Sequence, residues 1–326
     1  MGPSTKSVPF LQKKSSNQRY LVNRYPTCAA LYPHLIVLKQ RLNLASCCAD
    51  RIKIQFAALL NEGAWYRNER GRTHDSDGFW NLAYDLCQNV KGESEADARD
   101  AVLVDIHFCL GLTSSGNNDL AKARTHQQAF FALQKRICES IAPGFIDEKL
   151  GLAYAELGLC YMLAGKLDEG IEAYKREREI RDAIGINIPL SRDATFASAY
   201  MMRGDLDLAE KVLVECVELA EEKGMTKSSH RVGRVIYTLA NLRALQGRDD
   251  KAYQLHLKAH QLLVDTSSER EVPRSKHKLA EYLMRSHRYD DAINMINDAL
   301  NSWSHDPKVY RPELARTAFL KAQLFE

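Results

Sequence analysis

The sequence predicts an all-α fold: a right-handed superhelical solenoid of about six helical hairpins followed by a terminal helix. Two observations support this prediction. A Gly, an Asp three residues later and a small residue two further on recur, the small residues 39 to 49 positions apart, which is the period of a helical-hairpin array. Around each copy, apolar residues repeat every 3.6 positions. The copies are Gly71 with Ser76, Gly116 with Asp119 and Ala121, Gly165 with Asp168 and Gly170, Gly204 with Asp207 and Ala209, Gly247 with Asp250 and Ala252, and His287 with Asp290 and Ala292.

Each copy of the pattern predicts the turn of one hairpin. Glycine adopts the left-handed backbone conformation and so ends the first helix. The Asp is expected at the N-cap of the second helix, as for Asp168 and Asp207, where its carboxylate accepts free backbone N–H groups. The small residue, such as Gly170 or Ala252, lets the two helices approach closely.

The elements follow in order along the chain. An opening helix is expected over residues 28–44 and a last helix over 310–325. Six hairpins are predicted between them. Their helix pairs are 50–69 with 74–90, 98–114 with 119–140, 147–164 with 168–184, 191–203 with 207–223, 229–246 with 250–265, and 273–286 with 290–303.

Charge separates the N-terminus from the rest of the chain. Residues 1–49 carry seven Lys and Arg and no acidic residue, whereas the whole chain has a net charge of +3. We therefore expect residues 1–25 to form a basic, disordered tail and residues 26–326 to form the helical repeat domain. A weak contact with an acidic partner and an organelle transit peptide are alternatives for the tail.

Composition bounds the environment of the protein. A hydrophobic content of 45% supports a large core. No run of about 18 apolar residues occurs, so no membrane span is predicted. The eight Cys form no CxxC pair and lie mostly in apolar helical stretches, which favours buried, reduced thiols and an intracellular, cytoplasmic location.

The best-preserved copy resembles the tetratricopeptide repeat (TPR) family. It reads Leu157-Gly158 and Tyr161, followed by Gly165, Gly170 and Tyr174. The period of about 43 residues is longer than the usual 34, and is similar to the kinesin-light-chain style or to the C-terminal arrays of nucleotide-binding signalling proteins. The segments carrying that second likeness are Tyr32-Pro33-His34-Leu35 and Glu179-Ile180-Arg181-Asp182. No Walker-A sequence occurs, so the likeness to those signalling proteins is confined to the array.

In stacked hairpins the first helices line a concave groove, where such arrays bind peptides or extended segments. Asn side chains can hold a peptide backbone, and Arg can hold carboxylates. The Lys/Asn pair with which chaperone-tail-binding members clamp a terminal carboxylate is missing. The predicted groove residues are Asn61, Trp65, His107, Glu156, Ser198, Arg234, Tyr237, Asn241, Arg274, His277 and Glu281, with Arg316 added by the last helix.

The leading hypothesis is a non-enzymatic scaffold that binds a protein or peptide in this groove. No catalytic motif, cofactor site or nucleic-acid-binding feature is found. The alternative is an enzyme or small-molecule sensor with a pocket on the superhelix, using groove His, Glu and Tyr side chains as acid and base. His256 and His260 have a metal-ligand spacing but no neighbouring carboxylate, so no metal site is expected. The charges around Glu177 and Arg181 are expected on a solvated outer face.

The last helix breaks a rule of solenoids, whose end helices present a polar outer face. A stripe of Ala315, Phe319 and Ala322 is expected to pack on the sixth hairpin. Leu320 and Leu324, with Phe325 as a third candidate, then fall beside or outside it. This predicts a homodimer through the C-terminal helix; in the alternative, the helix tilts and buries both flanks itself.

Overall fold

The computed structural model describes residues 25–41, 49–69, 73–186, 190–225, 230–265 and 271–325. Within these ranges the chain is helical and contains no β-strand, which confirms the predicted fold class. Every predicted helix is present, with its ends within three residues of the expected ones. The α-helices are α1 (Tyr25–Arg41), α2 (Asp50–Glu69), α3 (Thr73–Gln88), α4 (Ala96–Gly116), α5 (Leu120–Ile141), α6 (Glu148–Leu163), α7 (Leu167–Ala183), α8 (Leu190–Arg203), α9 (Leu206–Glu222), α10 (His230–Leu245), α11 (Asp249–Asp265), α12 (Glu271–Arg285), α13 (Tyr289–Trp303) and α14 (Arg311–Ala322).

The chain forms two compact units. Unit 1 comprises Met1–Thr113 and Gln128–Pro143, and unit 2 comprises Ser114–Gln127 and Gly144–Glu326. The predicted basic tail lies outside the described residues, apart from its last position.

Unit 1 contains the first hairpin, α2 with α3. The indole N–H of the buried Trp80 donates to the Oδ1 atom of Asn61 at 2.9 Å. At the start of α2, Asp50 accepts hydrogen bonds from Lys53 and from the backbone N–H groups of Lys91 and Gly92. These bonds, that of Lys53 above all, hold the pKa of Asp50 at about 2. Asp50 thereby ties the start of α2 to the segment before α4.

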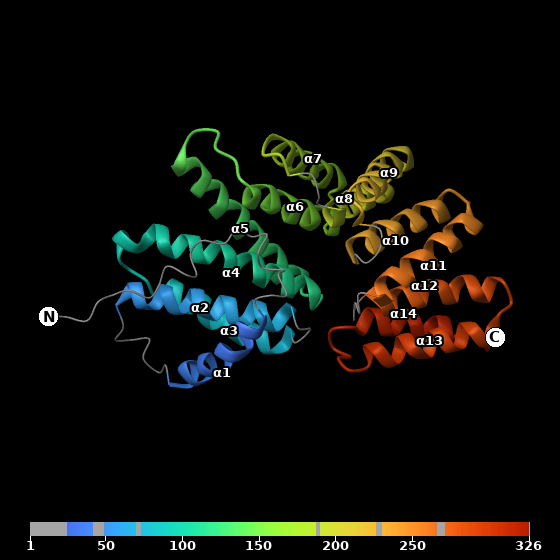
Figure 1. The fold of residues 1–326 in the computed structure, drawn as a ribbon, viewed down its shortest axis with the longest axis horizontal. Coiled ribbons are helices and arrows are strands. Elements are labelled where there is room, and N and C mark those ends of the chain that lie inside the picture. Colours follow the sequence, from blue (N-terminus) through green and yellow to red (C-terminus); the bar gives the residue numbers. More distant parts are fainter. Residues whose placement is uncertain are drawn as a thin grey trace. The chain divides into compact units, whose positions relative to one another are not determined.

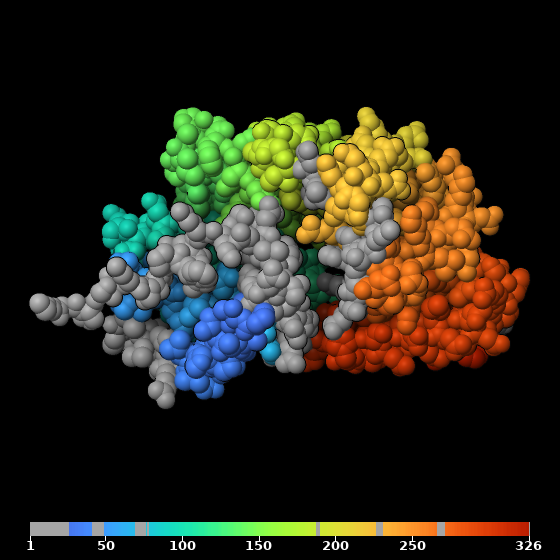
Figure 2. All heavy atoms as spheres, viewed as in Figure 1, coloured from blue at the N-terminus to red at the C-terminus, as the bar shows by residue number. Residues whose placement is uncertain are grey.

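In unit 2 the hairpins α6–α7, α8–α9, α10–α11 and α12–α13 pack one after another in sequence order, and α14 packs on α13 and α12 (Figure 1). In the space-filling view the yellow, orange and red segments follow one another in contact (Figure 2). The predicted small residues Ala209, Ala252 and Ala292 are fully buried, as a close helix pair requires. One core cluster runs through α6 to α11, and a second cluster is shared by α12, α13 and α14.

Left-handed residues mark the turns between paired helices. The backbone φ is 75° at Gly165, 95° at Gly204, 72° at Gly247 and 55° at His287. In the second hairpin the left-handed residue is Asn118, with a φ of 60°. The predicted turn glycine of that copy lies at the end of α4 instead. Asn is the non-glycine residue that tolerates this conformation best, so it can replace Gly here.

The predicted capping role of Asp168 and Asp207 is wrong. Helices α7 and α9 begin one residue before these aspartates, which lie in the first turn. The carboxylate of Asp168 accepts from Arg203 at 2.6 Å. The second copy has the capping geometry that the pattern predicts. Its aspartate, Asp119, precedes α5 and accepts the backbone N–H of Lys122 at 3.0 Å. In the first turn, Asp168 and Asp207 favour the helix through its dipole.

The predicted solvated face of α7 is also wrong in part. Glu177 and Arg181 are only 1% and 5% exposed. Arg181 donates two hydrogen bonds to Asp193 of α8, at 3.0 and 3.1 Å, and Arg192 donates to Glu177 at 2.7 Å. A buried charge is tolerated when it is paired in this way. The balanced network joins α7, α8 and α9 through Glu177, Arg178, Arg181, Arg192, Asp193 and Glu215.

The predicted packing stripe of α14 is on the wrong side of the helix. Ala315, Phe319 and Ala322 face solvent, and the side chain of Phe319 is 67% exposed. Leu320 is buried with α12 and α13 instead. The hydroxyl of Thr317 lies 2.9 Å from Nδ1 of His277 on α12, so a polar contact helps to set the rotation of α14.

Within the described ranges, no helix is both long enough and apolar enough to cross a membrane. The described cysteines form no disulfide. Burial raises the pKa of the Cys87 and Cys216 thiols to about 12, so both are protonated and inert.

Candidate binding surface

The predicted groove residues of unit 1 lie in its interior. Asn61, Trp65 and His107 are all buried. Trp65 packs against Phe108 with 6.1 Å between ring centroids, and His107 meets the Tyr84 ring edge-on at 5.4 Å. The spacing of these residues along their helices does not reveal which side of the helix faces the core. A residue that packs inside the unit and a residue that lines a groove therefore look the same in the sequence.

The predicted residues of unit 2 gather on consecutive first helices. On α10, three half-buried side chains are spaced three and four residues apart, which is one stripe of a helix. The same spacing recurs on α12, again with half-buried side chains. We call this set the first-helix face. It consists of Arg234, Tyr237 and Asn241 on α10, Arg274, His277 and Glu281 on α12, and Arg316 on α14.

Charges on two helices, α12 and α14, act on Tyr237 of α10. Burial raises the pKa of its hydroxyl, the positive charges of Arg274 and Arg316 lower it, and those of Glu271 and Glu281 raise it further. The charges that act on this hydroxyl therefore come from two helices that follow α11 in the array.

His277 and Glu281 form a polar link on this face. Burial opposes ionisation of Glu281, but hydrogen bonds from His277 and Lys278 outweigh it and hold the pKa of Glu281 at about 2. The two contacts measure 3.1 and 2.8 Å. His277 also meets Thr317 of α14. Glu281 is therefore ionised and already neutralised by its own helix.

Glu156 on α6 has a different environment. Burial raises the pKa of its carboxyl to about 7, against the opposing charge of Arg192. Its Oε2 atom accepts from Nε2 of Gln127 at 2.9 Å. Two buried atoms in this region, Oε1 of Gln127 and the hydroxyl of Tyr174, have no hydrogen-bond partner. Ser198 donates to the backbone of its own helix and is satisfied there.

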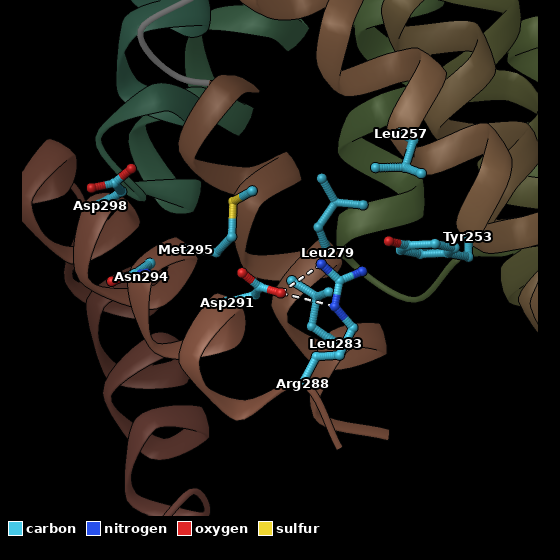
Figure 3. A pocket seen from close by; sticks show the side chains of 9 residues that line it. All are labelled: Tyr253, Leu257, Leu279, Leu283, Arg288, Asp291, Asn294, Met295 and Asp298. Carbon is cyan, nitrogen blue, oxygen red and sulfur yellow. Dashed lines mark hydrogen bonds and ion pairs between the residues drawn. The ribbon is translucent and has the colours of Figure 1, made fainter. Parts of the chain in front are cut away.

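The sequence analysis missed a pocket of about 260 Å³. It lies between the second helices α11 and α13 and over α12 (Figure 3). At its edge, Arg288 donates to Asp291 at 2.8 Å. No residue of the first-helix face lines it. The lining residues are Tyr253, Leu257, Leu279, Leu283, Arg288, Asp291, Asn294, Met295 and Asp298.

The two histidines with metal-ligand spacing have other surroundings. The ring of His256 is buried near Tyr237 and Tyr282, and burial lowers its pKa to about 4. Nδ1 of His260 lies 2.7 Å from the hydroxyl of Ser275. In the part of the chain that the structure describes, no cluster of three His, Cys, Asp or Glu could hold a metal ion.

The protein is similar to known proteins in its three-dimensional structure. No protein-family model and no curated protein matches the sequence. The apo form of RapI matches with a TM-score of 0.63 and 13% identity, over 89% of this chain and 95% of RapI. Yeast Tom70 matches at 0.48 and 12%, over 92% of this chain and 60% of Tom70. A Podosopora anserina kinesin light chain structure with TPR-like repeats matches at 0.42 and 18%, over 60% of this chain and 96% of that chain.

The chain has the tetratricopeptide-repeat fold. At these identities the likeness extends to the fold and not to a ligand. In this TPR array the first-helix face comprises residues of α10 and α12, joined by Arg316 of the single helix α14. The TPR resemblance predicted from Leu157-Gly158 and Tyr161 is thereby confirmed at the level of the fold.

Proposed function

We propose that the protein is a non-enzymatic scaffold that binds a peptide or a partner protein along the first-helix face of unit 2. The observation that carries this proposal is the repeated stripe of half-buried polar and charged side chains on α10 and α12. Asn241 can both donate to and accept from an extended peptide backbone. Arg234 and Arg274 can hold carboxylates.

Selection of random peptides on the immobilised protein tests this proposal. Enriched peptides should bind the wild type and a Lys211→Ala control, which changes an exposed residue of the second helix α9. They should bind Asn241→Leu at least tenfold more weakly, with folding checked by circular dichroism. Peptides that bind both variants equally well, or a selection that enriches none, would contradict the proposal.

The second candidate, a small-molecule sensor or enzyme, is favoured by Glu156. A carboxyl with a pKa of about 7 beside unsatisfied polar atoms is typical of functional sites. If this candidate holds, a small molecule will raise the melting temperature of the wild type but not of Glu156→Gln. A ligand-induced rise that survives this substitution would exclude Glu156 as the site.

The partner proposal extends to a homodimer through α14. Phe319 and Phe325 are 67% and 77% exposed, and burying each would contribute roughly 1.5–3 kcal/mol to association. Light scattering should show a concentration-dependent dimer that Phe319→Glu abolishes. A wild-type monomer at every accessible concentration would rule this out.

We also propose a reducing, cytoplasmic location. The described cysteines form no disulfide, and most of them are buried. Labelling of the intact protein in cells with a fluorescent tag tests this, and a signal confined to an oxidising compartment would contradict it.

A further inference from the structure

We propose that the turn between α4 and α5 and the loop between α13 and α14 form a latch, which closes the helical array of unit 2 on itself and lets the array extend when it opens. The latch consists of Asn118 and Val309. The side-chain Nδ2 of Asn118 donates to the backbone carbonyl of Val309 at 2.9 Å. Both residues belong to unit 2. The latch is independent of what the first-helix face binds.

This contact joins two parts of the array that are distant in sequence. Asn118 and Val309 are 191 residues apart. In a solenoid each repeat contacts only its neighbours, and the helices of unit 2 pack in this way, as α6 does with α7 and α8 with α9. A hydrogen bond from the start of unit 2 to its last loop is therefore a bond that the stacking of neighbouring hairpins does not supply.

The turn that carries Asn118 does not require an asparagine. Two backbone hydrogen bonds end α4 here, one from Asp119 to Ser114 and one from Asn118 to Ser115. Together they form the Schellman motif, whose left-handed position Asn118 occupies with a φ of 60°. Glycine adopts this conformation more readily, and it occupies the later turns at Gly165, Gly204 and Gly247. The asparagine therefore adds a side chain rather than a better turn, and that side chain makes the long-range contact.

The loop between α13 and α14 presents the acceptor. Helix α14 begins at Arg311 with Tyr310 as its N-cap, so the carbonyl of Val309 lies outside the hydrogen bonds of the helix. Asp306 orders this loop. Its Oδ1 accepts from the N–H of Val309 at 3.3 Å, and its carbonyl accepts from the N–H of Tyr310 at 3.1 Å. Asn118 supplies the donor that the carbonyl of Val309 needs.

The latch is weak enough to open. Asn118 is exposed and Val309 is half-buried, so water competes for both groups. A neutral hydrogen bond shifts an equilibrium by about two- to tenfold. A contact of this strength can break without unfolding any hairpin. A partner that binds the open array better than the closed one therefore shifts the balance between them.

Asn118→Gly and Asn118→Asp test the latch. Glycine keeps the left-handed turn and removes the donor, whereas aspartate keeps the size of the side chain but presents an acceptor to the carbonyl of Val309. Hydrogen–deuterium exchange of residues 304–310 measures whether the loop is held, and small-angle X-ray scattering measures the extension of the chain. We expect both variants to exchange at least about twofold faster in this segment and to have a larger radius of gyration, with the helix content unchanged by circular dichroism.

His287→Gly is the matched control. Among the described residues, His287 is the other left-handed residue that is not glycine, with a φ of 55°. Its Nδ1 atom lies 2.8 Å from the hydroxyl of Tyr289, only two residues along the chain, so its contact is local. This variant should exchange and scatter as the wild type does. Wild-type exchange or a wild-type radius of gyration in either Asn118 variant, or an equal change in His287→Gly, would overturn the latch.

Discussion

Gly158 and Gly170 face each other across the α6–α7 hairpin. A Cβ atom on Gly170 would lie 3.1 Å from the carbonyl oxygen of Gly158 and 3.3 Å from the amide nitrogen of Met162. Both are backbone atoms, which cannot rotate away as the end of a flexible side chain can. The close approach of the two helices therefore depends on the missing side chain at Gly170.

Gly170→Leu should lower the free energy of unfolding by about 1–3 kcal/mol, because the side chain forces the paired helices apart. Gly151→Ala on α6 is the control: its Cβ would meet Cγ2 of Ile180 at an ordinary 3.4 Å. That change should be neutral or stabilise by up to about 1 kcal/mol. Urea unfolding measures both, and equal stability of wild type and Gly170→Leu would contradict the packing described.

Arg181→Met should destabilise the protein by about 3–5 kcal/mol, because it leaves Asp193 buried without its main partner. The double variant Arg181→Met, Asp193→Leu should recover much of that loss, since no unpaired charge remains. Arg176→Ala removes an exposed pair and should change stability by less than about 0.5 kcal/mol. Thermal unfolding compares the three, and an Arg181→Met variant as stable as Arg176→Ala would contradict the network.

Glu156→Gln should separate from the wild type as pH rises. The pKa of Glu156 is raised from 4.5 in the unfolded chain to about 7 in the folded one. The folded state therefore binds more protons between these values, and the unfolding free energy falls as pH rises through that window. Above about pH 7 the variant should be more stable, by about 3 kcal/mol at most. Denaturation at pH 4 and pH 8 tests this, and a constant difference would refute it.

Leu320→Glu and Phe319→Glu should behave in opposite ways although the residues are adjacent. Leu320 is buried with α12 and α13, so a charge there should destabilise the fold by about 3 kcal/mol. Phe319 is exposed, so its replacement should leave the melting temperature nearly unchanged when it is measured at a concentration at which the wild type is monomeric. If Phe319→Glu destabilises the fold and Leu320→Glu does not, α14 packs through the stripe of Ala315, Phe319 and Ala322 that the sequence predicted.

The array could be predicted because its signals are local and repeated. A turn glycine such as Gly165 is required by the local backbone conformation, and a buried small residue such as Ala252 is required by the short distance between paired helices. Both requirements recur in each hairpin, so the sequence pattern recurs as well. Helix boundaries followed from the same pattern. The left-handed turn at Asn118 was missed because Gly116, two residues earlier, satisfies the pattern as well.

The surroundings of polar groups could not be predicted in the same way. Charged residues spaced three or four positions apart are typical of a solvated helix face. Arg181 is nevertheless buried, and its charge is paired with Asp193 of the next hairpin. The rotation of α14 depends on the contact of Thr317 with His277, 40 residues away. The raised pKa of Glu156 depends on burial by neighbouring helices. Each of these features needs long-range contacts that one sequence does not encode in its spacing.

The buried network of α7, α8 and α9 makes two hairpins of this array inseparable. Repeat proteins are often treated as exchangeable modules, in which one unit can be duplicated, deleted or transplanted. Here the third hairpin supplies Glu177 and Arg181 and the fourth supplies Asp193 and Arg192. Any rearrangement that separates the two hairpins leaves buried charges of both signs without their partners. An engineered array should therefore keep this pair of hairpins together and place its junctions on either side of it.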